Sequence, residues 1–158
     1  MAIAVGEPAP DFELRDQHGQ SVRLSSYRGE KAVVLMFYPY AFSRVCSGEL
    51  AQVRDSLPAF ESADVQLLAV SCDPMFSLRV FAEQDGLTFP LLSDFWPHGA
   101  VAEAYGVLDP GGFARRSTYV VDRDGIVRWA VHNETPEARD LEEQARVVAR
   151  VTRPAPGG

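Results

Sequence analysis

The residues of greatest chemical interest in this chain lie in the segment FYPYAFSRVCSGEL, residues 37–50. An apolar run ends at Pro39, an aromatic loop follows, and Cys46 comes where helical spacing begins. The unpaired N–H groups and the positive end of the dipole at a helix start favour an anion, so a thiol placed there readily becomes a thiolate. The pattern therefore favours a nucleophilic cysteine.

The residues just before Cys46 could complete a reactive site around its thiol. Ser43, three residues earlier, could direct its hydroxyl group into the same pocket. Pro39 would set the path of the chain as it leaves the apolar run, and residues 40–42 would exclude bulk water. The alternative is a cysteine that is packed in the core at the start of a helix and does no chemistry.

The composition is that of a globular protein. The chain has 158 residues, of which 46% are hydrophobic and 23% charged, so residues 1–158 are expected to form a single domain. The formal net charge of −7 and the lack of a basic run argue against nucleic acid or an anionic membrane as a partner. The N-terminal residues lack the features of a signal peptide, and no apolar run approaches about 18 residues. We therefore expect a cytoplasmic protein.

Strand patterns and helical patterns alternate along the chain. Hairpins are expected over residues 11–29 and 117–132, with turns at His18-Gly19 and Asp124-Gly125. Further strands are expected at residues 32–38, 64–73 and 88–94. Helices are expected from about Cys46 to Phe60, kinked or divided at Pro58, and at residues 76–87, 98–107 and 136–152. Residues 153–158 are expected to be a flexible, frayed tail.

This order of elements predicts an α/β fold. Strand–helix–strand connections require parallel strands with right-handed crossovers, and the hairpins add antiparallel edges. The expected result is a central mixed β-sheet flanked by helices, with a β-hairpin at the N-terminus. Loops that leave the carboxyl ends of parallel strands form the natural crevice for chemistry. Cys46 and Cys72 both follow such strand ends.

Several alternative functions lack their signatures in this chain. A disulfide oxidoreductase would carry C-x-x-C at the helix start, whereas residues 46–49 read C-S-G-E. The G-x-S-x-G, P-loop and dinucleotide-binding motifs are also missing. No metal site is expected, because none of the histidines has metal-ligand spacing relative to either cysteine; they are His18, His98 and His132.

Residues 39–46, PYAFSRVC, resemble the active-site motif of the peroxiredoxin family, in which proline, threonine or serine, and cysteine follow at this spacing. The resemblance extends beyond this motif. Residues 6–29 resemble the N-terminal hairpin of the family, and residues 94–107 and 114–129 resemble its later segments, in the same order. Within the family, the chain looks closest to the one-cysteine alkyl hydroperoxide reductase E group of actinobacteria. The resemblance implies a thioredoxin-like fold and a thiol-dependent peroxidase acting on hydrogen peroxide, organic hydroperoxides and peroxynitrite, in antioxidant defence.

The resemblance also implies roles for four positions. Cys46 would be the peroxidatic nucleophile, and Pro39 would shield it. Ser43, a serine in place of the commoner threonine, would donate a hydrogen bond to the peroxide. Arg116 would hold the thiolate and stabilise the oxygen that leaves.

Strand geometry predicts that only one of two adjacent arginines reaches the site. Arg115 is the neighbour of Arg116, but adjacent strand residues point to opposite faces, so only one of the two should reach the site. We expect Glu49 to orient Arg116, because an unpaired carboxylate would disfavour the nearby thiolate.

The implied reaction needs no metal, flavin or haem. Cys46 would become a sulfenic acid and be reduced by an external thiol, with mycothiol and mycoredoxin, or thioredoxin, as the implied partners. A homodimer through the aromatic loop around Phe42 and Trp96 is also implied. We expect Cys72 to be a buried bystander; the alternative is a resolving cysteine. A non-enzymatic redox sensor or a thioredoxin-fold binding protein is the alternative function.

Overall fold

The computed structural model describes residues 2–133 and 139–152. Within them, one seven-stranded sheet comprises β1 (Glu13–Arg15), β2 (Ser21–Arg23), β3 (Ala32–Phe37), β4 (Val65–Ser71), β5 (Leu91–Ser93), β6 (Ser117–Val121) and β7 (Val127–His132). The helices are α1 (Arg44–Asp55), α2 (Met75–Asp85), α3 (Ala100–Ala104) and α4 (Leu141–Thr152), with short 3₁₀ turns η1 (Leu24–Tyr27) and η2 (Leu57–Ala59). The predicted order of elements is confirmed.

The sheet is mixed, as the strand patterns predict. Its strand order is β2-β1-β5-β4-β3-β6-β7. The central strand β4 runs parallel to both of its neighbours, β3 and β5. The remaining pairs, which include the two predicted hairpins, are antiparallel. The carboxyl ends of β3 and β4 therefore lie side by side, at the edge where both cysteines follow.

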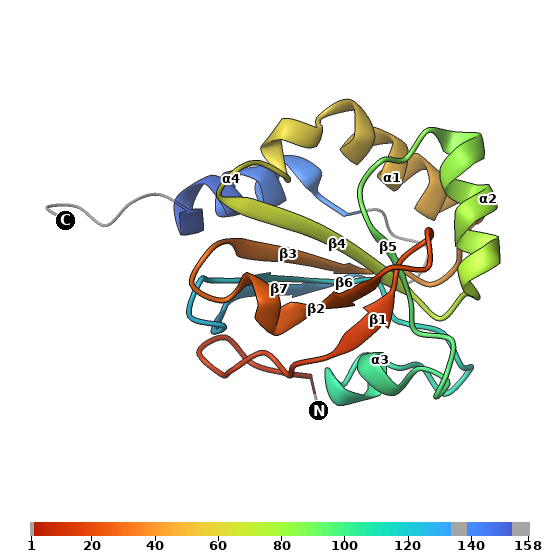
Figure 1. Ribbon diagram of the computed structural model, residues 1–158. Helices are drawn as coiled ribbons and strands as arrows, with labels where there is room; N and C mark the ends of the chain where they lie inside the picture. Colours follow the sequence, from red (N-terminus) through yellow and green to blue (C-terminus); the bar gives the residue numbers. More distant parts are fainter. Residues whose placement is uncertain (1, 134–138, 153–158) are drawn as a thin grey trace, which may run out of the picture.

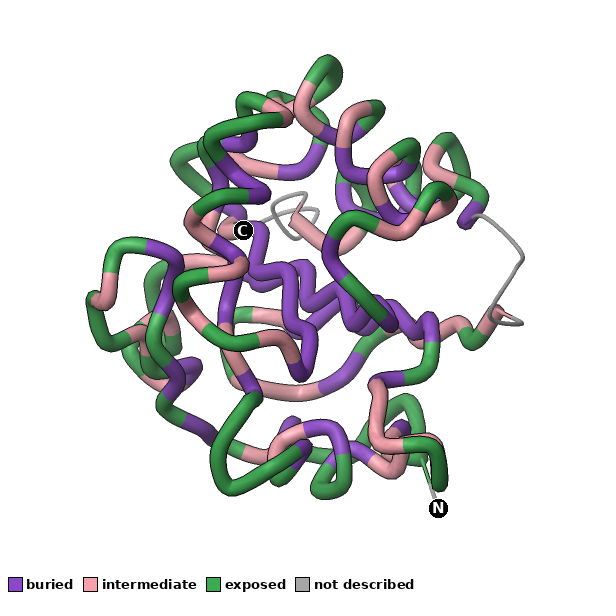
Figure 2. The backbone as a smooth tube through the Cα atoms, turned by 90° about the vertical axis from the view of Figure 1, so that its right-hand side faces the viewer, coloured by how far each residue is buried: buried purple, intermediate pink, exposed green. Residues whose placement is uncertain are grey.

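Helices cover both faces of the sheet, so its central strands are buried on both sides. Figure 1 shows α1, α2 and α4 over one face and α3 on the opposite side. Every residue of β3 is buried, and alternate residues contribute to two separate apolar clusters, as a strand with period two requires. In Figure 2 the central strands are buried, and exposed residues lie along the outer surface.

The helix boundaries differ from the predicted ones because single side chains set them. Helix α1 begins at Arg44 rather than near Cys46, since Ser43 caps it. It ends at Asp55, and Pro58 lies in the separate turn η2, so the predicted division there is confirmed.

The other helices and strand β5 are shorter than their predicted ranges. Helix α4 begins at Leu141 rather than at residue 136, with the Asp140 carboxylate accepting the backbone N–H of Glu143 at 3.0 Å. Residues 136–138 and the predicted tail, 153–158, lie outside the described residues. No helix in the described part of the chain has the length and apolar character needed to cross a bilayer.

Candidate active site

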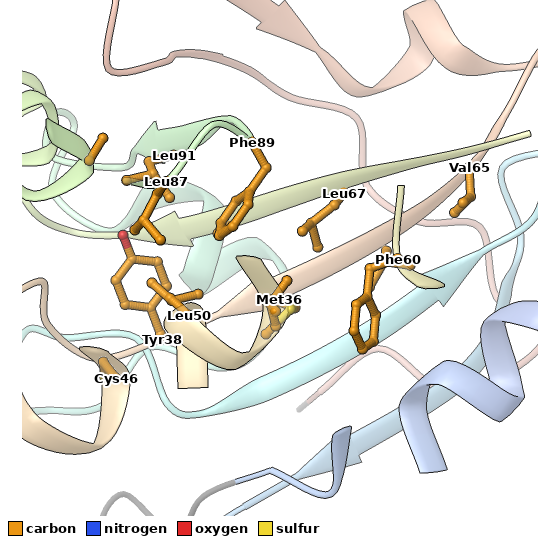
Figure 3. Packing of buried hydrophobic residues seen from close by; sticks show 14 of the residues in the cluster. Met36, Tyr38, Cys46, Leu50, Phe60, Val65, Leu67, Leu87, Phe89 and Leu91 are labelled. Carbon is orange, nitrogen blue, oxygen red and sulfur yellow. The ribbon is translucent and has the colours of Figure 1, made fainter. Parts of the chain in front are cut away.

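Cys46 lies in the first turn of α1 and is fully buried. Its backbone N–H donates to the Ser43 side-chain oxygen at 3.2 Å, so Ser43 is both the helix cap and a neighbour of the thiol. Figure 3 shows Cys46 among the residues of the core cluster that also holds Tyr38 and Leu50. The thiol therefore lies at a helix start, as predicted, in surroundings from which water is largely excluded.

The structure brings Arg116 and Glu49 to this thiol. Arg116 Nη2 donates to Cys46 Sγ at 3.2 Å, and Nη1 forms a hydrogen-bonded ion pair with Glu49 Oε1. Both charged side chains are almost completely buried, with 1% and 3% of their surface exposed. Arg115 instead has a half-exposed side chain that pairs with Asp109 at 3.5 Å. The two adjacent arginines diverge as predicted, although both precede β6, which begins at Ser117.

A second buried arginine, Arg139, completes the charge network, and sequence reasoning missed it. Its backbone N–H donates to Glu49 Oε2 at 2.7 Å, and its Nε lies 3.3 Å from the same oxygen. Nη1 donates to the Ser117 carbonyl oxygen at 2.8 Å and to Thr118 Oγ1 at 2.7 Å, and Nη2 donates to the Phe37 carbonyl oxygen. No motif in the chain marks Arg139 as part of a site.

The charges of this network favour a negatively charged sulfur. Glu49 by itself would neutralise Arg116 and leave nothing to balance a thiolate. Burial lowers the pKa of Arg139, while the neighbouring Glu49 carboxylate opposes that change; a guanidinium keeps its proton in proteins. Two guanidinium groups against one carboxylate leave one positive charge, which is available to a thiolate at Cys46.

The loop between β3 and α1 forms the outer wall of the site. Pro39, two residues after the end of β3, is buried, and Ala41 is buried as well. Tyr40 and Phe42 are half-exposed, and their rings pack on Phe113 and Phe81, with centroids 5.2 Å and 5.0 Å apart. The loop thus covers Cys46 and presents aromatic surface outward.

A model of the AhpC/TSA family matches residues 5–130 of the chain. The chain belongs to the AhpC/TSA family of peroxiredoxins. It is 52% identical to alkyl hydroperoxide reductase E of Mycobacterium tuberculosis over 151 residues, which covers 95% of this chain and 99% of that protein. The family resemblance read from the sequence is confirmed, and it makes the chain a thiol-dependent peroxidase, an oxidoreductase.

Solved structures of related proteins confirm the thioredoxin-like fold class. The crystal structure of peroxidoxin BcpB from Mycobacterium tuberculosis is 32% identical, with a TM-score of 0.82, and the match covers 96% of this chain and 99% of that one. AhpC of Mycobacterium tuberculosis is 26% identical, with a TM-score of 0.83 and coverage of 97% and 100%.

Cys72, the other cysteine of this peroxiredoxin, lies just after β4 and is a free thiol. It is 8% exposed, and the backbone of Ala114 partly offsets the effect of burial on its pKa. Burial, together with the nearby carboxylates of Asp94 and Asp73, raises the pKa of the Cys72 thiol to about 11. Cys46 belongs to the core cluster under α1, whereas Ala114, whose backbone lies beside Cys72, belongs to the cluster on the opposite face of the sheet.

In the Cys46→Ser variant, we expect iodoacetamide to alkylate Cys72 very slowly at about pH 8, because the thiolate is the reactive form. A pKa of about 11 leaves on the order of one thiol in a thousand ionised at that pH. The rate should therefore rise steeply as the pH approaches 11. Alkylation followed by mass spectrometry measures it, and the same variant unfolded in guanidinium is the control. Rapid labelling of the folded protein near neutral pH would contradict this prediction.

Two of the histidine side chains make local contacts. His98 Nε2 lies 2.6 Å from the Gly112 carbonyl oxygen, and His132 Nδ1 lies 2.7 Å from Ser117 Oγ. Among residues 2–133 and 139–152, no three His, Cys, Asp or Glu side chains lie close enough together to hold a metal ion.

Proposed function

We propose that this chain is a one-cysteine peroxidase in which the Cys46 thiolate reduces hydroperoxides. The observation that carries the proposal is the 3.2 Å contact between Arg116 Nη2 and Cys46 Sγ. In the reaction, the thiolate attacks the distal peroxide oxygen, a sulfur–oxygen bond forms and the O–O bond breaks. The second oxygen takes up a proton and leaves as water or an alcohol, and Cys46 becomes a sulfenic acid.

The other site residues have separate roles in this proposal. Arg116 holds the thiolate and stabilises the negative charge that develops on the leaving oxygen. Glu49 orients Arg116, supported by the ion pair between them. The Ser43 hydroxyl, whose oxygen accepts the Cys46 N–H, donates a hydrogen bond to the peroxide. Pro39 shields the site, consistent with its burial beside the loop.

An external thiol then reduces the sulfenic acid, because Cys72 is poorly suited to do so. A thiol whose pKa is about 11 is a weak attacking group at neutral pH. We propose mycothiol with mycoredoxin, or thioredoxin, as the reductant, supported by the mycobacterial origin of the 52% identical relative. The substrates are hydrogen peroxide, organic hydroperoxides and peroxynitrite.

We further propose a cytoplasmic homodimer whose subunits meet at the aromatic loop and Trp96. In support, Tyr40 and Phe42 are half-exposed and Trp96 is 81% exposed. The net charge of −7 opposes binding to nucleic acid or to anionic membranes. We propose that residues 1–158 form one domain.

The test is the intact mass after one equivalent of hydrogen peroxide, with and without dimedone as a sulfenic-acid trap. Wild type and Cys72→Ser should both gain one oxygen and be trapped equally, whereas Cys46→Ser should not react. Loss of two hydrogens in wild type, replaced by trapped acid in Cys72→Ser, would identify Cys72 as a resolving cysteine. If Cys46 stays a thiol while a free cysteine is oxidised, the peroxidase proposal is wrong.

A redox sensor without turnover is the second candidate function, and it is favoured by the same reactive thiol. Repeated peroxide consumption with a thiol reductant separates the two. The enzyme consumes many equivalents of peroxide, whereas a sensor stops after one.

A further inference from the structure

Asp73 connects the end of β4 to the loop that carries the candidate active site. The backbone N–H of Ala41 donates to Asp73 Oδ2 at 2.8 Å. Ala41 lies in the loop between β3 and α1, which also contains Pro39 and Ser43. The carboxylate of one strand end thus holds the peptide that follows the neighbouring strand.

The contact between Asp73 and Ala41 lies just beyond the last backbone hydrogen bond between β3 and β4. The hydrogen-bond ladder between β3 and β4 ends with the Tyr38 N–H, which donates to the Val70 carbonyl oxygen at 3.0 Å. The next residue, Pro39, has no N–H to donate. Beyond it, the Ala41 N–H is bound by a side-chain carboxylate rather than by a strand carbonyl. Hydrogen bonds to an ionised acceptor are about twice as strong as neutral ones, so the carboxylate holds the Ala41 N–H more strongly than a carbonyl oxygen would.

Asp73 is itself held in place through both its carboxylate and its backbone. Ser71 is fully buried, and its hydroxyl donates to Asp73 Oδ2 at 2.7 Å. The Ser93 hydroxyl, from β5, donates to the Asp73 carbonyl oxygen at 2.6 Å. The acceptor for Ala41 is therefore positioned by the parallel core of the sheet.

The anchored loop contains an unfavourable backbone conformation that needs such support. Phe42 has a φ of 67°, in the left-handed region that bulky residues rarely adopt. Such a conformation persists when the surroundings determine it on both sides. Ala41 is held by Asp73 on one side, and Ser43 caps the Cys46 N–H on the other.

We propose that Asp73 is a positioning residue for the peroxide reaction. Its carboxylate holds the Ala41 N–H and thereby fixes the loop geometry that places Ser43 beside Cys46. Asp73 acts through the loop and touches neither the sulfur nor the substrate. The inference rests on the proposed peroxidase function and adds a residue to the machinery that sets its rate.

The test compares Asp73→Ala and Asp73→Asn in a Cys72→Ser background, so that only Cys46 reacts. We expect Asp73→Ala to lower the second-order rate constant for oxidation by hydrogen peroxide about 10- to 100-fold, because a misplacement near 1 Å can cost that much. Alkylation of Cys46 by iodoacetamide needs the thiolate but not the peroxide geometry, so it should fall less than about 3-fold. Asp73→Asn should stay within about 3-fold of the background, since its amide oxygen can accept both the Ala41 N–H and the Ser71 hydroxyl.

Asp122→Ala in the same background is the matched control for loss of stability. Asp122 Oδ1 also accepts backbone N–H groups, from Asp124 at 2.9 Å and Ile126 at 3.0 Å, but in the hairpin between β6 and β7. The Asp122→Ala substitution should lower the melting temperature and leave the rate constant for oxidation by hydrogen peroxide unchanged.

The outcomes separate this inference from the function on which it rests. A background protein that does not react with peroxide would overturn the peroxidase proposal and the role of Asp73 with it. A reactive background that Asp73→Ala leaves unchanged would overturn the role of Asp73 alone. Equal losses in oxidation and alkylation, or an Asp73→Asn variant as slow as Asp73→Ala, would also overturn it.

Discussion

Replacing Arg116 with methionine is expected to lower the rate constant for oxidation of Cys46 by hydrogen peroxide about 100- to 1000-fold, the usual cost of losing one preorganised charge-stabilising donor. Methionine fills much of the same volume but has no N–H to offer to Cys46 Sγ. In the variant, the charge of Arg139 is balanced by the buried Glu49 carboxylate, so no positive charge remains for the thiolate. Stopped-flow fluorescence or competition with a peroxidase of known rate measures the effect.

Arg115→Met is the matched control for this prediction. It changes the same residue type one position earlier, where the side chain is half-exposed and pairs with Asp109 at 3.5 Å. The peroxide rate constant should stay at the wild-type value. A loss of less than about 10-fold in Arg116→Met would mean that this arginine is not the main stabiliser of the developing charge.

Arg139→Met is expected to lower the free energy of unfolding of the reduced protein by about 3–5 kcal/mol, which is the usual cost of removing one partner of a buried ion pair. The Arg139 side chain is buried, forms an ion pair with Glu49 at 3.3 Å, and donates to Thr118 Oγ1 and to the carbonyl oxygens of Ser117 and Phe37. Methionine would leave those carbonyl oxygens buried without this donor. Urea denaturation followed by circular dichroism gives the free energy of unfolding.

Arg146→Met provides the comparison, because Arg146 is exposed on α4. Its effect on the free energy of unfolding should stay within about 0.5 kcal/mol, as for most surface substitutions. If Arg139→Met were as mild as Arg146→Met, the buried network would not contribute to stability. Arg139→Met should also slow peroxide oxidation, since it removes the excess positive charge beside Cys46.

The strands and turns were predictable because their signals are local. The apolar run that becomes β3 is buried on both faces, and its pattern shows this without any knowledge of its neighbours. The hairpin turns contain Gly19 and Gly125, whose φ angles of 79° and 82° lie in the left-handed region that glycine adopts without steric cost. Helix ends were less predictable, because a single cap such as Ser43 moves a boundary that periodicity only approximates.

A thiol at a helix start, with Pro39 and Ser43 ahead of it, could be recognised without the structure, because these residues lie within one short stretch of chain. The charged groups around this site come from other segments of the chain. Arg116 precedes β6 and Asp73 follows β4, so both lie near the carboxyl end of β3, which runs between those two strands, and Arg139 comes from the segment ahead of α4. The pattern along a chain records whether a residue is buried or exposed. It does not record which distant side chain will lie opposite a buried charge. Arg116 was expected at the thiol from the family resemblance, whereas the pairing of Arg139 with Glu49 and the contact between Asp73 and Ala41 became visible only in the folded protein.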